Sequence, residues 1–293
     1  MGIFGRLKTG FAFARRSVRV LRDHPRLAVL PAVAGVAGLL YVAALWGVVL
    51  SVEPSPNQPL LVAALFCLYF GSTLLASYFT AALMFCAKQV FEDDEPSIRD
   101  GLRAAGRNLG PLLAWAAISA VVGVIIRLIE SNDSLPAKLI AGVFSVAWGI
   151  LTYFVVPVIV FEDVDVFEMF SRSKETVQQT WGESLGAAGG VGLVTVALVL
   201  LGALPGVVLL VAVPGATAVA LVVLVGGVLL AGLVGQTLTG IAKTALYVYA
   251  TEDETPAYFD GIEFGDDGDG GDGGNNGVRS RLPGSGGIVG RKS

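Results

Sequence analysis

Residues 185–242 read LGAAGGVGLVTVALVLLGALPGVVLLVAVPGATAVALVVLVGGVLLAGLVGQTLTGIA and carry no charged side chain. An α-helix needs about 20 residues to cross roughly 30 Å of bilayer hydrocarbon, so this stretch is too long for one crossing. The pairs Pro205-Gly206 and Pro214-Gly215 supply turn chemistry between two crossings. The stretch therefore predicts two membrane-spanning helices, at 185–204 and 215–242.

Four other long apolar runs precede this stretch, at 27–52, 60–87, 109–129 and 136–161. Only 15% of the residues are charged, whereas about 25% is usual for a soluble domain. The mean hydropathy of the chain is +0.71. We therefore expect an all-α membrane protein, with a membrane domain over 1–250 that folds as a bundle of six transmembrane helices.

Three shorter segments, at 3–22, 97–108 and 164–182, place apolar residues every three or four positions with charges between them. Short amphipathic helices of this kind lie in the membrane interface and do not cross it. Each segment precedes two apolar runs, and each pair of runs ends in an aromatic-acidic signature. The signatures are Val90-Phe91-Glu92-Asp93, Val160-Phe161-Glu162-Asp163 and, more loosely, Val248-Tyr249 with Glu252-Asp253. This order predicts three repeats of a helix-plus-hairpin module with interfacial amphipathic helices.

Lysine and arginine side chains are concentrated on one side of the predicted spans. Residues 1–26 carry seven, the 88–108 connection four and the 162–184 connection two, against Arg127 and Lys138 on the opposite side. Because basic loops stay cytoplasmic, we expect a multi-pass protein of the cell membrane with its N- and C-termini cytoplasmic. Residues 251–293 are acidic and rich in Gly and Asp, which predicts a disordered cytoplasmic tail.

The N-terminal bases are candidates for contacts with anionic lipid headgroups, because their segment leads directly into a span. These residues are Arg6, Lys8, Arg15, Arg16, Arg19 and Arg22. We therefore expect the lipid bilayer as a partner and no nucleic acid. An unidentified protein partner that binds the cytoplasmic helices or the tail is a further possibility.

The sixth run contains a stripe of small residues that predicts a helix-packing or cavity face. The stripe consists of Gly227, Ala231, Gly235 and Thr239, with Gln236 as a polar neighbour. Small residues four apart allow helices to approach closely, and this favours an internal packing face over a dimer seam. In the fourth run, Pro157 predicts a kink.

Residues typical of catalysis or metal binding are scarce in this chain. His24 is the only histidine, and the acidic turn Glu92–Glu95 is interpreted as a solvated turn because it lacks the spacing of a calcium loop. Cys67 and Cys86 share one predicted helix about 28 Å apart and are interpreted as small apolar core residues. Arg127 and Glu130 are expected to pair on one helix face. We expect no catalytic residue, no cofactor and no metal, and therefore no enzyme.

Three stretches carry a family resemblance: GIFGRLKTGF at 2–11, LRDHP at 21–25 and YFVVP at 153–157. Over about residues 1–250, the chain resembles a family of uncharacterised six-span membrane proteins from halophilic archaea. Its layout is also similar to the membrane domain joined to some glycerophosphodiester phosphodiesterases, a likeness of architecture that carries no activity. Neither resemblance implies a function or site residues.

Two functional hypotheses follow from these patterns. The first is a non-enzymatic membrane scaffold or partner subunit, favoured by the basic amphipathic helix at 3–22 and by the scarcity of polar groups in the spans. The alternative is a transporter or channel for a small or apolar solute, favoured by the repeats, Pro157 and the stripe of the sixth run.

Overall fold

A computed structural model describes residues 3–51, 58–132, 134–162, 164–213, 215–252 and 256–259. Over these residues the protein consists of helices and short connections, without a strand, which confirms the all-α prediction. The helices are α1 (Ile3–Asp23), the 3-10 helix η1 (Pro25–Ala28), α2 (Val29–Ser51), α3 (Gln58–Phe91), α4 (Ile98–Arg107), α5 (Leu109–Glu130), α6 (Leu135–Leu151), α7 (Val155–Phe161), α8 (Glu168–Gln179), α9 (Trp181–Ala212) and α10 (Thr217–Glu252).

Six helical stretches of the described residues are long and apolar enough to cross a membrane, which confirms the predicted number. They are Pro25–Ser51, Pro59–Phe91, Leu109–Glu130, Leu135–Phe161, Ala188–Ala212 and Thr217–Glu252. The first four agree with the predicted runs to within a few residues. The last two are displaced toward the C-terminus, because the turn between them was predicted in the wrong place.

The turn between α9 and α10 lies at Val213–Ala216, where Gly215 has a φ of +89° that favours glycine. We predicted a span ending at 204 because Pro205-Gly206 looked like a turn, and this was wrong: Pro205 lies inside α9. Transmembrane helices tolerate proline because a neighbouring helix supports the freed backbone. Here the support is close, since a Cβ on Gly206 would collide with the backbone of Leu224 in α10.

The predicted kink at Pro157 appears as a break between α6 and α7. Proline removes the hydrogen bond to the carbonyl four residues earlier and clashes with it, and for Pro157 that residue is Tyr153. Tyr153 lies within the break, which extends from Thr152 to Phe154. The hydroxyl of Ser173 in α8 supports the break, since it donates to the carbonyl of Leu151 at 2.7 Å and accepts from the Phe154 amide at 3.1 Å.

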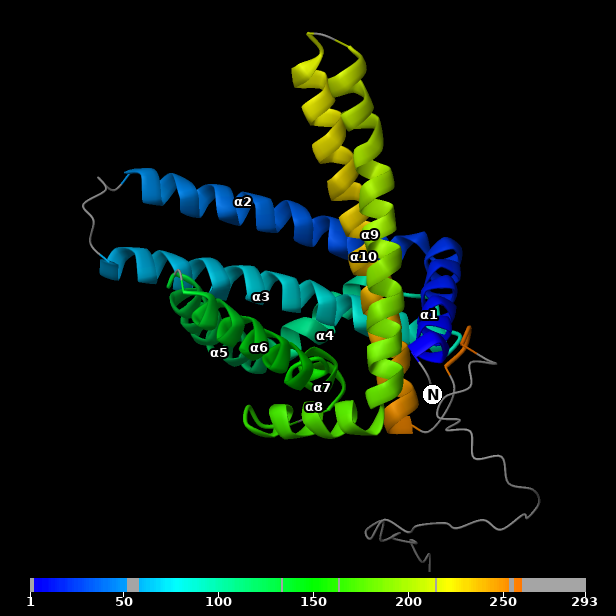
Figure 1. Ribbon diagram of the computed structural model, residues 1–293. Coiled ribbons are helices and arrows are strands. Elements are labelled where there is room, and N and C mark those ends of the chain that lie inside the picture. Colours follow the sequence, from blue (N-terminus) through cyan, green and yellow to red (C-terminus); the bar gives the residue numbers. More distant parts are fainter. Residues whose placement is uncertain are drawn as a thin grey trace, which may run out of the picture.

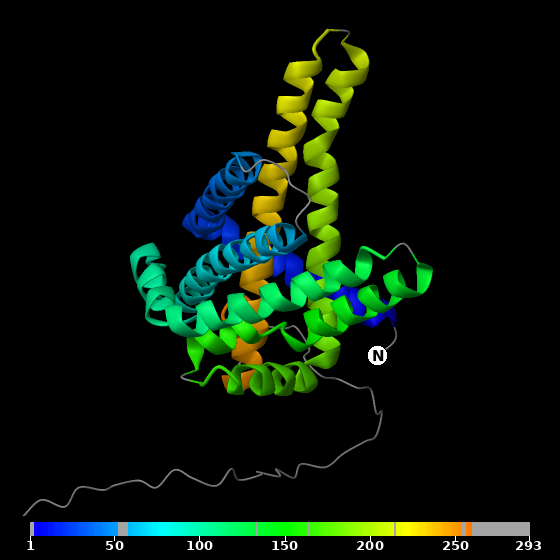
Figure 2. The ribbon, with the colours of Figure 1, turned by 90° about the vertical axis from the view of Figure 1, so that its left-hand side faces the viewer.

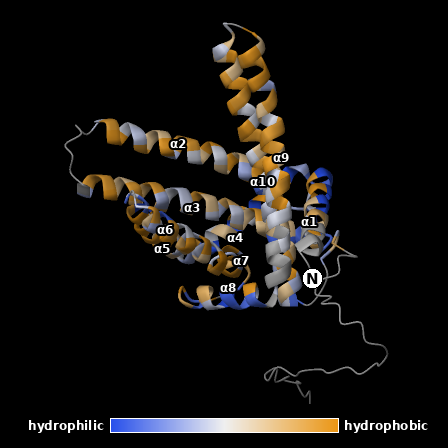
Figure 3. Ribbon diagram, viewed as in Figure 1, coloured by the Kyte–Doolittle hydropathy of each residue, from blue (hydrophilic) through white to orange (hydrophobic). Residues whose placement is uncertain are grey.

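The apolar helices form two arms that diverge from a common base, and the base includes α1 and α8 (Figure 1). α2 and α3 extend side by side with α5 packed along α3, whereas the α9–α10 hairpin rises in a different direction, as Figure 2 also shows. The six helices therefore do not form the single bundle that we expected. Figure 3 shows that both arms are predominantly hydrophobic, while hydrophilic residues gather on α1 and α8 at the base.

Helices α4 and α5 pack directly on α3, and α6 packs on α5. The Ser97 hydroxyl accepts from the Asp100 amide at the start of α4. The approach of α4 is so close that a Cβ on Gly101 would meet the carbonyl oxygen of Ala82. Farther along α3, the Trp115 indole of α5 donates to the Ser77 hydroxyl at 3.0 Å and stacks on Trp148 of α6, with centroids 6.0 Å apart.

The described chain continues past the predicted start of the tail at residue 251. Helix α10 ends at Glu252, and the segment Pro256–Phe259 packs back on the base. Phe259 is fully buried, because an aromatic side chain gains more from packing than from solvent exposure. The rest of the predicted disordered tail, 260–293, lies outside the described residues.

Candidate functional site

Helix α1 is docked on the lower part of α9 through glycine. A Cβ on Gly10 would collide with the backbone of Gly186 and Gly190, so the two helices touch backbone to backbone. The docked side of α1 also buries Phe13 and Val20. We expected the apolar residues of 3–22 to face the membrane. Many of them instead pack against the protein.

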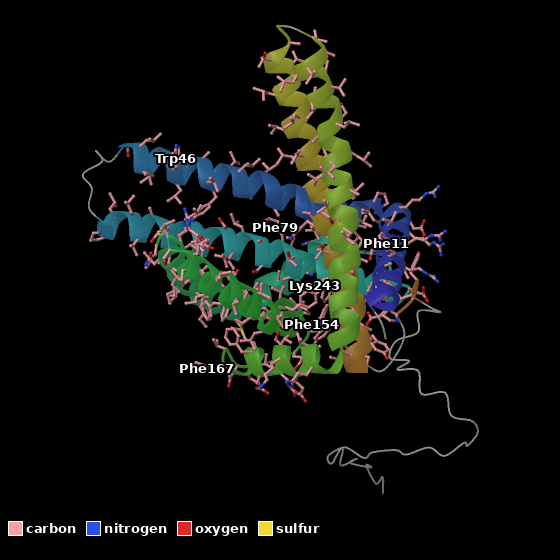
Figure 4. All side chains as sticks on the ribbon, in the orientation of Figure 1. Phe11, Trp46, Phe79, Phe154, Phe167 and Lys243 are labelled. Carbon is pink, nitrogen blue, oxygen red and sulfur yellow. The ribbon has the colours of Figure 1, made fainter. Side chains whose placement is uncertain are left out.

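The opposite side of α1 exposes Arg15, Arg19 and Arg22, which we call the arginine face. Phe11 and Val18 adjoin this face with exposed fractions of 47% and 44%, large values for apolar side chains. Figure 4 shows nitrogen atoms projecting from the outer side of α1 and labels Phe11 on the same helix. The combination of arginines and exposed apolar side chains is typical of a helix surface at the lipid headgroups.

Three other residues were predicted to contact lipid headgroups: Arg6, Lys8 and Arg16. Arg16 donates from Nη1 to the carbonyl of Tyr258 at 3.0 Å, so it binds the C-terminal segment and is only half-buried. The side chains of Arg6 and Lys8 lie outside the described residues, although their backbone belongs to α1.

The segment Pro256–Phe259, here called the strap, is the end of the described chain and packs on α1 and α3. The ring of Phe259 lies between Phe13 and Phe91, with centroids 5.4 and 5.7 Å away. The Tyr258 hydroxyl lies 3.4 Å from Nε2 of His24, which gives the only histidine of the chain a structural contact. Partial burial and, next, the charge of Asp23 raise the pKa of Tyr258.

The three aromatic-acidic signatures meet at Lys88 of α3. Its ammonium group pairs with Glu252 of the third signature and lies 3.8 Å from Glu92 of the first. The same group lies 5.3 Å from the centroid of Phe161 in the second signature, a cation–π contact. We call these four residues the Lys88 cluster, and one lysine in it contacts all three predicted repeats.

A second set of contacts joins α7, α8 and α10 beside the Lys88 cluster. The Tyr247 hydroxyl donates to Glu162 at 2.5 Å, and Nε of Arg172 lies 3.4 Å from the same carboxylate. Lys243 of α10 lies 4.2 Å from the ring centroid of Tyr153 in a half-buried position. Figure 4 labels Lys243 at the base, where the helices converge.

The small-residue stripe of α10 lies largely against α9. A Cβ on Gly227 would collide with the backbone of Gly202, and one on Gly235 would meet the side chain of Thr195. Ala231 also contacts this seam, since its Cβ lies 3.4 Å from the position of a Cβ built on Gly202. The Thr239 hydroxyl donates to the carbonyl of Gly235 at 2.8 Å, so its polar group is satisfied within its own helix.

Gln236 differs from the rest of the stripe because it is exposed and lines a groove between the arms. The groove has a volume of about 730 Å³ and lies between α2 and α3 on one side and α9 and α10 on the other. Most of its lining is apolar, and Ser72 and Thr80 are the other polar residues on it. Gly35 and Gly38 of α2 also line it, with open space where a Cβ would project.

The remaining candidates for chemistry occupy ordinary structural positions. Among the described residues no three His, Cys, Asp or Glu side chains lie close enough to hold a metal ion. Cys86 is buried and donates to the carbonyl of Ser97, but Cys67 is exposed and so is not the core residue that we expected. Arg127 and Glu130 pair at 3.4 Å, as predicted from their spacing.

Sequence reasoning missed both the Lys88 cluster and the strap. The sequence marked the signatures that contain Glu92, Phe161 and Glu252, but it did not indicate that they meet at Lys88, since Lys88 and Glu252 are 164 residues apart. The strap did have a signal: the adjacent aromatic residues Tyr258 and Phe259 stand out in a polar, acidic stretch.

Comparison with known proteins places most of the chain in one family. The model of a family of unknown function, DUF6159, matches residues 60–257. The matched range begins in α3 and ends within the strap, so it includes the Lys88 cluster, the stripe of α10 and most of the groove, but not α1. No curated protein and no solved structure matches the chain.

Proposed function

The chain belongs to this family of unknown function, and from its own residues we propose a non-enzymatic membrane scaffold or partner subunit that binds anionic lipid headgroups through α1. The observation that carries the proposal is the docking of α1. Contact between Gly10 and Gly190 fixes α1 against the lower part of α9. In this position Arg15, Arg19 and Arg22 face outward. Because the backbone of the docked helix is already ordered, its arginines bind phosphate with less loss of backbone entropy than those of a free peptide would.

The proposal includes a place in the membrane for this helix. The apolar spans cross the bilayer, and α1, α4 and α8 lie in the cytoplasmic interface around the base. Two facts support this arrangement: hydrophilic residues gather at the base, and α1 and the strap, the first and last described segments, lie together there. Cytoplasmic termini in the cell membrane follow from the distribution of basic residues.

The proposed threefold repeat is supported by the order of the elements. Helix α1 precedes the pair α2–α3, α4 precedes α5 and α6 with its continuation α7, and α8 precedes the hairpin α9–α10. The signatures that end the three modules also lie together, since Lys88 contacts all three. A halophilic archaeal source and a likeness to phosphodiesterase-linked membrane domains remain predictions from the sequence.

The test is lipid retention by the full-length protein in nanodiscs that contain phosphatidylcholine and phosphatidylglycerol. We expect the triple variant Arg15→Gln, Arg19→Gln, Arg22→Gln to retain less phosphatidylglycerol after transfer to detergent, measured by native mass spectrometry. A matched control, Arg99→Gln, Arg103→Gln, Arg107→Gln, removes three exposed arginines from α4. Equal retention by wild type and the α1 variant, or equal loss in both variants, would contradict a specific role for α1.

The groove between the arms supports the alternative function, a transporter or channel for a small or apolar solute. Its lining is apolar and its only long polar side chain is that of Gln236. If the groove is a transport route, Gln236→Leu and Gly38→Leu should both reduce uptake of the solute into proteoliposomes. A protein partner that binds the cytoplasmic helices or the tail is a further proposal, tested by crosslinking and co-purification in mild detergent.

A further inference from the structure

The surface of α1 is divided into sectors by its contacts. Successive residues of a helix are turned by about 100°, so Arg16 and Asp23, seven positions apart, lie on nearly the same side. The strap occupies this side, where Arg16 binds the Tyr258 carbonyl. The arginine face lies next to it, and the docked side against α9 lies beyond. The strap therefore runs along the edge of the arginine face.

The strap fixes the point at which the chain leaves the base. Phe259 is buried between α1 and α3, and the residue that follows it is Asp260. The next residues are strongly acidic, with six carboxylates before the first base, Arg279. They are Asp260, Glu263, Asp266, Asp267, Asp269 and Asp272. We call residues 260–272 the acidic segment; it lies outside the described residues.

The acidic segment is long enough to reach the arginine face. Arg15 and Arg22 are separated by about 10 Å along α1, at 1.5 Å per residue. An extended chain covers about 3.3–3.6 Å per residue, so four residues already span that distance. Because Phe259 holds the segment beside α1, its effective concentration at the arginine face is on the order of millimolar. Six negative charges thus lie within reach of three exposed positive ones.

We propose that the acidic segment 260–272 binds the arginine face of α1 and competes there with anionic lipid headgroups. This inference rests on the proposed function, since it names an intramolecular regulator of the same face. In a bilayer poor in anionic lipid the segment occupies the arginines, and in an anionic bilayer phosphate groups displace it. Added salt weakens both contacts, because the charges on both sides are exposed to solvent.

The test uses the full-length protein with Phe11→p-benzoylphenylalanine, a photoreactive aromatic residue beside the arginine face. In phosphatidylcholine nanodiscs we expect light to crosslink position 11 to the acidic segment, identified by peptide mass spectrometry. Phosphatidylglycerol should lower this yield. Replacing the six acids by Asn or Gln should lower it at least about fivefold, the factor expected for a single arginine–anion contact at a surface. The control Arg279→Gln, Arg281→Gln alters tail charge without removing an acid.

The outcomes separate this inference from the proposed function. It is supported if neutralising the six acids removes the crosslink and raises phosphatidylglycerol retention, while the control leaves both unchanged. It is overturned if the crosslink is absent or does not depend on the acids, even where the arginines still govern lipid retention. If the crosslink depends on the acids but lipid retention ignores the arginines, the tail contact stands and the lipid function fails.

Discussion

A single methyl group on α9 should release α1 from the base. Gly190 touches the backbone of Gly10, and a Cβ there would collide with the Gly10 Cα, carbonyl carbon and oxygen. Backbone atoms cannot rotate aside, so Gly190→Ala must push α1 away from α9. The adjacent Gly189→Ala is a matched control, because a Cβ at that position meets nothing within 4 Å.

The size of the effect follows from two opposing terms. Alanine is more favourable than glycine inside a helix by about 0.5–1 kcal/mol, and this gain applies equally to both variants. Overpacking against a well-packed neighbour costs about 1–3 kcal/mol, and only Gly190→Ala incurs it. The difference between the variants is therefore about 1–3 kcal/mol, which corresponds to roughly a 5- to 150-fold larger population with α1 detached.

Limited digestion with trypsin measures this population, since trypsin cleaves after arginine. Most of the stability of a helix in a protein comes from its tertiary packing, so Arg15, Arg19 and Arg22 become cleavable when α1 leaves α9. Cleavage tracks the open population when opening is fast relative to proteolysis. We expect Gly190→Ala in nanodiscs to be cut within α1 faster than Gly189→Ala. Equal cleavage of the two variants would refute the backbone contact as the element that holds α1.

Three other predictions concern the remaining contacts. Gly227→Ala should lower the stability of the α9–α10 seam by about 1–3 kcal/mol relative to Gly226→Ala, which faces open space; equal thermal midpoints would contradict this. Lys88→Met removes two solvent-exposed ion pairs and a cation–π contact, so it should lower the free energy of unfolding by about 1–2 kcal/mol. Amide exchange near Phe161 should become faster in this variant but not in the control Lys174→Met on α8. The raised pKa of Tyr258 means that its contribution to strap docking is fully present below the ordinary tyrosine pKa of about 10 and is lost as the pH rises through the raised value. The protection of the 257–259 amides, measured relative to the intrinsic base-catalysed exchange rate, should therefore fall at alkaline pH in wild type and stay constant in Tyr258→Phe.

The sequence predicted the helices well because the relevant signal is local. A long run without charge has only one stable form in hydrocarbon, and six such runs predict six helices. The error at Pro205 has the same origin, since a Pro-Gly pair marks a turn in water, but an apolar environment with a neighbouring helix lets the helix continue. The local sequence could not show which of the two Pro-Gly pairs forms the turn, because Gly206 contacts Leu224 on the other helix.

The candidate sites were less predictable because they depend on tertiary contacts. The arginines of α1 were visible as a basic amphipathic pattern, but which of them face outward depends on contact with Gly190. Arg16 could not be separated from Arg15 and Arg19 by sequence, because its partner Tyr258 is 242 residues away. The Lys88 cluster draws on three modules, and no single module contains it.

The base and the arms are held together by different forces. In lipid no hydrophobic effect drives helices together, so spans associate through small residues and polar contacts. The α9–α10 seam has such contacts at Gly202 and Gly227, but Gly35 and Gly38 of α2 meet nothing across the groove. Spans that are apolar on all sides cross a bilayer, with tilts of up to about 40°, and do not lie along its surface. The groove opens between two arms that each have their own packing contacts, and α2 has none of the close glycine contacts that join α9 to α10.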